Sequence, residues 1–194
     1  MPADRQDLER RIAAATPSDT VRGLIFNAIF SVVREAAGDE AARQCDPARK
    51  GVRTEFFNYP VTDFLRIFWD ASDRLEGKVG GAEAAFYRIG HRAGELVLGS
   101  MLGKTLLALA GTGGPQQLLG HAPGGYRATV SYGERLVSWP GERHARLVFI
   151  RDFLVPNFHC GVLAAGAERV GGKNVKAVGR QTGPLEAVYD ITWE

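Results

Sequence analysis

The sequence predicts an α+β protein in which an N-terminal helical bundle packs on a C-terminal four-stranded antiparallel sheet of β-β-α-β-β order. Up to about residue 125 the apolar residues recur with the period of a helix, and beyond it they alternate as in strands. Helices followed by strands are typical of the α+β class. A chain of 194 residues can bury one substantial core. We therefore expect a single domain, 1–194, with a helical part (1–125) and a sheet part (126–194).

Two helices are expected near the N-terminus. The first dozen residues can form a short charged helix. Thr16, Pro17 and Asp19 then offer an N-cap, a proline at the first helical position and an acid at the third, which predict a helix from there to Gly38. Residues 39–44 can add a turn or two. The predicted buried stripe follows the spacing of one helix face: Val21, Leu24, Ile25, Ala28, Ile29, Val32 and Val33.

Two longer helical regions complete the predicted bundle. The aromatic cluster 56–60 leads into a helix that ends near Gly77. The second region covers residues 82–110, and glycines at 99 and 103 predict a kink or a break there. The rest of the helical part is expected as a loop (111–115), a helical turn (116–119) and a link (121–125).

The sheet part is predicted from Tyr126 onward. Alternating residues give a hairpin that turns at 139–142, a third strand at 174–180 and a last strand at 185–194. Between the two strand pairs, Pro156 suits the first turn of a helix, and Gly171-Gly172 offers the left-handed conformation that commonly ends one. Small residues fill the middle of this helix, 156–170, so we expect it to pack closely against the sheet.

Composition limits the classes of function. The net charge is +2 with dispersed arginines, which does not indicate nucleic-acid binding. No apolar run is long enough to span a bilayer, and the N-terminus is too charged for a signal peptide, so a cytoplasmic location is expected. Cys45 and Cys160 are too few and too far apart for a disulfide framework or a cysteine-based zinc site. We expect both to be free thiols.

Three local patterns invite a chemical interpretation, and each has a plainer alternative. Residues 99–105 approach a phosphate-binding loop, but Leu98 stands where a glycine is required and a helix precedes it, so helix packing is favoured. His159 and Cys160 look reactive, but helix neighbours do not face one another, which favours a buried thiol beside a half-exposed histidine. His91 could be half of a metal or haem site, but pairing with Glu95 four residues later is favoured.

No cofactor or metal is expected, and the protein is expected not to be an enzyme. The four histidines, at 91, 121, 144 and 159, share no metal-ligand spacing. No Ser-His-Asp arrangement and no Gly-x-Ser-x-Gly motif is visible.

The sequence closely resembles a family of unknown function that is restricted to myxobacteria and heavily duplicated in their genomes. The segments that carry the resemblance span nearly the whole chain: 21–27, 57–61, 103–111, 130–135, 151–154 and 161–163. The resemblance implies no activity, because none is assigned to that family.

The predicted topology is also similar to a superfamily that joins haem nitric-oxide sensors, vinyl-reductase-type small-molecule sensor domains and subunits of vesicle-tethering complexes. The resemblance implies a helical part packed on an antiparallel sheet, with a glycine-containing helix between two strand pairs. The haem sensors' Tyr-x-Ser-x-Arg motif is not reproduced at residues 126–130 or 130–135, and the zinc cysteines of some sensor domains are missing.

Two functions from different classes remain, and an enzyme that uses Cys160 comes third. The first is a sensing or regulatory module that binds a small hydrophobic ligand between the helices and the sheet. The second is an adaptor or scaffold that forms a homodimer or docks a protein partner, as tethering subunits do. A sensor needs a cavity of roughly 300 Å³ or more, whereas an adaptor needs an exposed apolar patch. The candidate pocket residues are Phe57, Tyr59, Phe64, Phe68, Trp69, Phe86, His91, Phe158 and Cys160.

Overall fold

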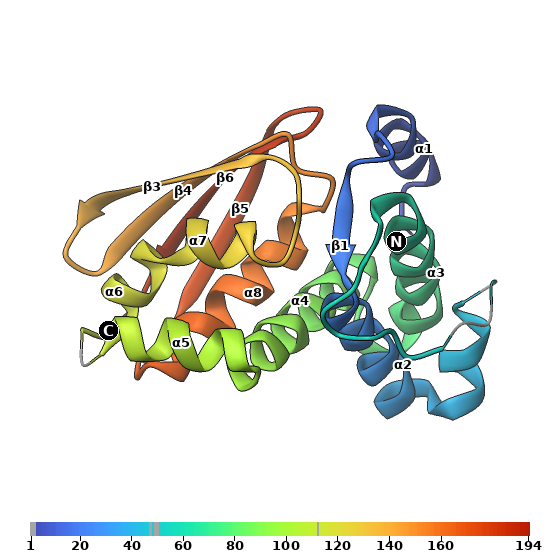
Figure 1. Ribbon diagram of the computed structural model, residues 1–194, viewed down its shortest axis with the longest axis horizontal. Coiled ribbons are helices and arrows are strands. Elements are labelled where there is room, and N and C mark those ends of the chain that lie inside the picture. Colours follow the sequence, from blue (N-terminus) through green and yellow to red (C-terminus); the bar gives the residue numbers. More distant parts are fainter. Residues whose placement is uncertain (1–2, 47, 49–50, 112) are drawn as a thin grey trace.

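The computed structural model describes residues 3–46, 48, 51–111 and 113–194, and it has the predicted α+β architecture. Four antiparallel strands pair in the order β3-β4-β6-β5, and one helix connects the two hairpins. Figure 1 shows the sheet at one end of the molecule and helices α1 to α3 at the other. The elements of the sheet part are β3 (Glu134–Gly141), β4 (His144–Ile150), α8 (Pro156–Arg169), β5 (Lys176–Gly183) and β6 (Glu186–Thr192).

The helical part has two groups of helices. Helices α1 to α4 form the bundle, and α5, α6 and α7 run beneath the sheet (Figure 1). Their bounds are α1 (Arg5–Ala14), α2 (Gly23–Gln44), α3 (Val61–Val79), α4 (Ala82–Gly99), α5 (Met101–Ala110), α6 (Gly114–Gly120) and α7 (Ala122–Arg127). Within the described ranges, no helix is both long and apolar enough to cross a membrane.

A cluster of buried aromatic rings forms the core of the bundle. Phe68 of α3 lies 4.5 Å from Phe86 of α4 and 5.4 Å from Phe158 of α8, measured between ring centroids. Phe64 and Trp69 are buried beside them. Because Phe158 belongs to the sheet part, this core joins the two parts of the chain.

The sheet buries one face only. Along β4, Ala145, Leu147 and Phe149 are buried, while the residues between them are partly exposed. The same alternation runs along β6. Cys160 and Leu163 of α8 pack against the buried face, as the predicted close packing of this helix requires.

Glycines allow α8 to lie equally close to α4. A Cβ atom added to Gly90 of α4 would overlap the backbone carbonyl of Phe158, and one added to Gly161 of α8 would overlap that of Tyr87. The small residues of α8 therefore serve its contact with a helix as well as its contact with the sheet, and the sequence pattern alone had indicated only the sheet.

The main helix boundaries agree with the sequence prediction. Helix α8 begins at Pro156 and ends at Arg169, one residue before the expected end. The region 82–110 breaks at Ser100, whose hydroxyl accepts a hydrogen bond from the Gly103 backbone and caps α5. Helix α2 continues to Gln44 across a kink at Gly38, where φ is 88°.

The predicted helix start at Thr16–Asp19 is wrong. Residues Thr20–Arg22 form a short strand, β1, which pairs with β2 (Asn58–Pro60), and α2 starts only at Gly23. The Asp19 carboxylate accepts a hydrogen bond from the Thr16 backbone, as in a local turn, and also pairs with Arg151 at 2.7 Å. A distant partner thus overrides the local capping pattern.

The predicted start of the first long strand is also wrong. Tyr126 lies in α7, which occupies the expected link at 121–125, and β3 begins at Glu134. Val130 makes only an isolated bridge to Val21. Gly133, with φ of 69°, turns the chain into β3. The alternation of apolar residues at 128–132 reflects packing of an irregular segment against the bundle.

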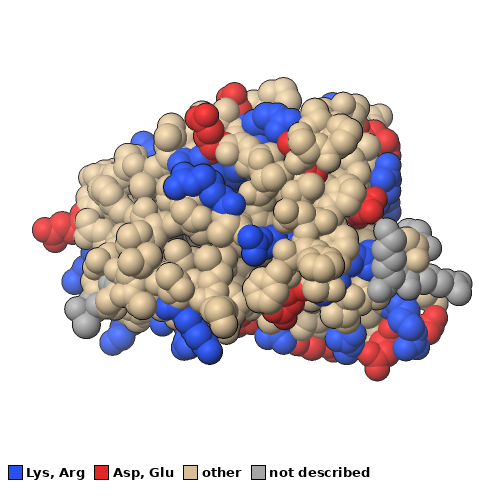
Figure 2. Space-filling model, in the orientation of Figure 1, with Lys and Arg blue, Asp and Glu red and all other residues tan. Residues whose placement is uncertain are grey.

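Charged residues of both signs are interspersed on the molecular face in Figure 2, and much of its left half is uncharged. That half corresponds to the end of the molecule that holds the sheet and α5 to α7 in Figure 1.

Candidate functional site

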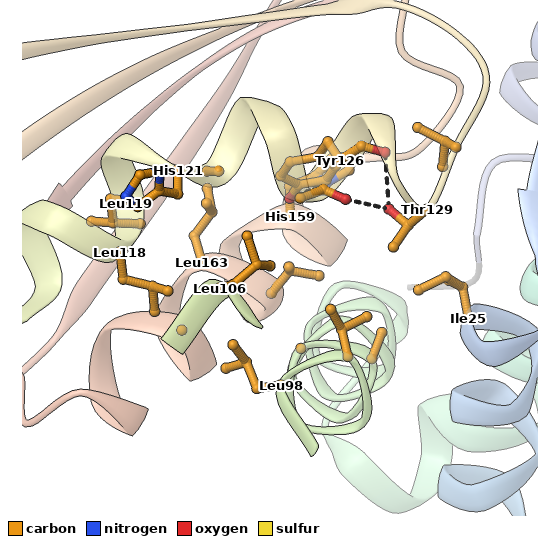
Figure 3. Close-up of a pocket in the computed structure, with 18 of the residues that line it drawn as sticks. Ile25, Leu98, Leu106, Leu118, Leu119, His121, Tyr126, Thr129, His159 and Leu163 are labelled. Carbon is orange, nitrogen blue, oxygen red and sulfur yellow. Dashed lines mark hydrogen bonds between the residues drawn. The ribbon is translucent and has the colours of Figure 1, made fainter. Parts of the chain in front are cut away.

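A cavity of about 100 Å³ lies between α4, α8 and the group α5 to α7. Its walls are almost entirely apolar, and Figure 3 shows leucine side chains from four of these helices around it. The residues that form the walls include Leu98 of α4, Leu106 of α5, Leu118 and Leu119 of α6, and Leu163 of α8. Ile25 of α2 contributes from the bundle.

Local sequence features explain why these side chains meet. The cap at Ser100 turns the chain from α4 into α5, which brings Leu106 back over α8. Two glycines leave space between these helices. A Cβ atom at Gly166 of α8 would lie 3.6 Å from Leu118, and one at Gly125 of α7 would lie 3.2 Å from Leu106. The cavity is therefore kept open by positions without side chains.

One end of the cavity is polar and fully buried. The Tyr126 hydroxyl lies 3.0 Å from His159 Nδ1, and His159 Nε2 lies 3.0 Å from an Asp152 carboxylate oxygen. The other Asp152 oxygen pairs with the Arg135 guanidinium, and the Leu154 backbone donates a hydrogen bond to Asp152. These groups form one continuous buried network from the cavity to the strand β3.

Electrostatics fix the protonation of this network at both ends. Burial by itself raises the pKa of Asp152, but the charge and hydrogen bond of His159, together with Arg135, outweigh burial and lower that pKa below its usual range. Burial raises the pKa of Tyr126 far above 10. Asp152 is thus ionised and Tyr126 protonated, and His159 lies between them with one ring nitrogen within hydrogen-bond distance of each.

The sequence prediction of a half-exposed His159 is wrong. Its side chain is 1% exposed, and both ring nitrogens are within hydrogen-bond distance of buried partners. Cys160 points away from the cavity toward Gly179 of β5, and burial raises the pKa of its thiol to about 11. A protonated thiol is a poor nucleophile.

Among the nine predicted pocket residues, only Phe158 lines this cavity. Phe64, Phe68, Trp69 and Phe86 pack against one another in the core of the bundle. The remaining four lie elsewhere: Phe57 is 63% exposed, Tyr59 packs on Phe26, His91 lies on the surface of α4, and Cys160 faces the sheet.

His91 pairs with Glu95, as predicted, and also reaches Glu168 of α8 at 2.9 Å. Nucleotide binding is not supported at 99–105 either, because Gly103 packs against the backbone of Val97 and Leu98 at a helix junction. In the described part of the chain, no three His, Cys, Asp or Glu residues gather as a metal site would require.

The sequence reasoning missed the leucines of α5 and α6 and the residue Tyr126. One signal was available for the leucines: α5 is almost wholly apolar and contains Lys104 as its single charge, yet it sits in no predicted core. No comparable signal exists for Tyr126, because its partner lies 33 positions later in the sequence.

The fold is that of H-NOX proteins. An H-NOX variant from K. algicida, crystallised as the unliganded Fe(II) form, is 13% identical with a TM-score of 0.71, over 89% of this chain and 96% of that one. An H-NOX variant from S. oneidensis gives 13%, 0.69, 89% and 96%. An oxygen-binding H-NOX domain related to soluble guanylate cyclases gives 11%, 0.66, 89% and 95%. At this identity, the likeness concerns the fold alone.

By sequence, the chain belongs to a family of proteins of unknown function, DUF2378, whose model matches residues 14–194. Among curated proteins, no match was found.

The residues around the cavity do not fit a haem group. Pockets for drug-sized ligands occupy roughly 300–1,000 Å³, several times the volume of this cavity, about 100 Å³. Haem iron also needs an axial ligand such as His, Cys or Tyr. The Tyr126 hydroxyl and the His159 ring already lie within hydrogen-bond distance of each other. His121, the other histidine in the lining, lies on the short turn between α6 and α7.

Proposed function

We propose that this chain is a non-catalytic sensing module that binds a small, mainly apolar ligand in the cavity beneath the sheet. The observation that carries the proposal is the apolar cavity with a buried, hydrogen-bonded network at one end. The fold supports it, since solved proteins of this fold include an oxygen-binding domain. The buried thiol and the histidine held between two partners argue against a catalytic role.

The volume sets the size of the ligand. A cavity of about 150 Å³ in an engineered lysozyme takes benzene or xenon, so the present cavity, about 100 Å³, suits a molecule of benzene size or less. This is a smaller ligand than the sequence-based expectation of roughly 300 Å³ implied.

Helix α5 supplies the response that a sensor needs. The Met101 and Leu109 side chains of α5 are 77% and 55% exposed. The Leu106 side chain forms part of the cavity wall. Segments with few buried apolar contacts open at low free-energy cost. A ligand that contacts Leu106 would therefore stabilise α5 on the rest of the molecule.

Thermal-shift measurements with benzene, furan and pyrrole test the proposal. At one hundred times its Kd, a ligand adds about 2.7 kcal/mol to the free energy of unfolding, which raises the melting temperature by roughly 5–10 °C in a chain of this size. Gly166→Leu should fill the cavity next to Leu118 and remove the shift, and Gly166→Ala should reduce it.

The matched control is Gly77→Leu, because a side chain at Gly77 of α3 would meet no neighbour within 4 Å. This variant should keep the full shift. The proposal fails if no probe raises the melting temperature of the unmodified protein, or if Gly166→Leu and Gly77→Leu respond alike.

A second candidate, a protein adaptor, is favoured by one observation: the outward face of the sheet carries exposed apolar residues, among them Leu136 and Val178.

A further inference from the structure

The outward face of the sheet is covered by none of the helices that the structure describes. Helices α6, α7 and α8 lie on the opposite side of the strands (Figure 1). Three apolar residues form a row across this outward face, since Leu136 of β3 is paired with Val148 of β4, and Val148 with Val188 of β6. Leu136 is 55% exposed, and Val148 and Val188 belong to neither of the two large core clusters.

The charges on this face are separated along the strands. At one end, Glu134 and Glu186 flank Ile150 in register, and both glutamates are exposed. Toward the other end, Arg146 and Arg180 approach Asp190, at 2.9 and 3.6 Å, and Lys176 lies opposite Thr192. One end therefore carries two negative charges, and the other carries two positive charges, Arg146 and Lys176, against one negative, while Arg180 lies level with Val188 in the middle row.

We propose that a second copy of this chain docks on this face, sheet against sheet, through a two-fold axis that runs across the strands. Of the two in-plane axes, one that follows the strands would place the glutamate ends against each other. An axis across the strands reverses their direction, so each glutamate end meets the basic end of the partner. An interface of this kind uses the same patch on both copies, and aligned sheet packing is a common arrangement.

The size of the face sets the expected affinity. The four strands, with spacings of about 4.8 Å between strands and 3.4 Å between residues, give a footprint of roughly 450 Å² per copy. Stable interfaces bury about 800 Å² per partner. The dimer is accordingly weak, forms at micromolar concentrations or above, and weakens with salt, because its charge pairs are exposed.

Sedimentation velocity of the full chain over a range of concentrations tests this arrangement. The unmodified protein should shift from monomer to dimer with concentration at low salt. Glu134→Lys with Glu186→Lys makes both ends positive, and Lys176→Glu with Arg180→Glu makes both ends negative, so each double variant alone should be monomeric. An equimolar mixture of the two should restore a dimer, since the positive ends of one variant then meet the negative ends of the other.

The matched control is Glu9→Lys with Glu83→Lys, which makes the same change of net charge on exposed helical residues outside the sheet. This variant should dimerise as the unmodified protein does. A chain that stays monomeric at several hundred micromolar overturns the proposal. So do charge variants that dimerise alone, and a mixture of folded variants, checked by circular dichroism, that stays monomeric.

Discussion

At the scale of single residues, buried charges determine which segments are fixed in place. Asp152 is 3% exposed, but Arg135, His159 and a backbone amide surround its carboxylate. Removing one partner of such a group leaves a buried charge without compensation, which is far more costly than the net contribution of the pair. This network holds the connection between β4 and α8, and with it the polar end of the cavity.

Asp19 should make stability depend on pH. Its hydrogen bond with Arg151, opposed by burial, lowers the pKa of Asp19 from 3.8 to about 2. A carboxyl with a lowered folded-state pKa contributes stability that is full above pH 4 and is lost as the pH falls toward 2. The contribution is about 1–2 kcal/mol once solvent screening of the half-exposed Arg151 is allowed for.

Urea unfolding of the protein and of Asp19→Asn between pH 2 and pH 6 measures this contribution. The difference in unfolding free energy should be largest near pH 6 and should vanish near pH 2. Asp39→Asn, which breaks an exposed pair with Arg34, is the control and should have little effect throughout. A difference for Asp19→Asn that is constant with pH would contradict the assigned cause.

At the scale of elements, the contact of α4 with α8 depends on two glycines. No side chain fits at Gly90 or Gly161, because the backbone of the other helix occupies the position of the Cβ atom. An alanine there must push the two helices apart. The displacement would also open the wall of the cavity, since both helices line it.

Gly90→Ala should therefore destabilise the protein by more than the roughly 1–3 kcal/mol that is typical of overpacking. In a solvated helix the same change stabilises by about 0.4–1 kcal/mol. Gly77→Ala, with no neighbour within 4 Å, should show that gain. Chemical denaturation of both variants measures the contrast, and equal effects at Gly90 and Gly77 would show that α4 and α8 are not in close contact.

At the scale of the whole molecule, the helical and sheet parts share a core. The largest cluster of buried apolar residues combines helices α1 to α4 with Phe153, Leu154 and Phe158 from the sheet part. Arg11 of α1 adds hydrogen bonds to the Leu154 carbonyl and to Gln181 of β5. The single-domain organisation stays a prediction, and this shared core supports it.

Calorimetry tests the single domain directly. Because the core crosses the boundary near residue 125, heating should give one transition whose calorimetric and van't Hoff enthalpies agree. Phe158→Ala, which removes a ring shared by both parts, should lower that one transition by about 3–5 kcal/mol in stability without splitting it. Two resolved transitions would instead indicate separate helical and sheet domains.

The sequence by itself determined the fold class, the bounds of α8, the break at Ser100 and the last strand. Each of these depends on a local signal: a proline and a glycine pair at the helix ends, glycines at 99 and 103, or strict alternation of apolar residues. Such signals act over a few neighbouring residues, so they can be recognised without knowledge of the rest of the chain.

Only the tertiary structure decided the strand β1, the position of the cavity and the burial of His159. Residues Thr20–Arg22 become a strand because Asn58–Pro60 lie beside them, and Asp19 lies outside the helix, where it pairs with Arg151. Of the aromatic residues predicted to line a pocket, Phe158 lies at this cavity, while Phe64 and Phe68 pack in the core of the bundle, and the leucines of α5 and α6 surround the space. Each outcome depends on contacts between residues far apart in the sequence, where packing and charge pairing outweigh local preference.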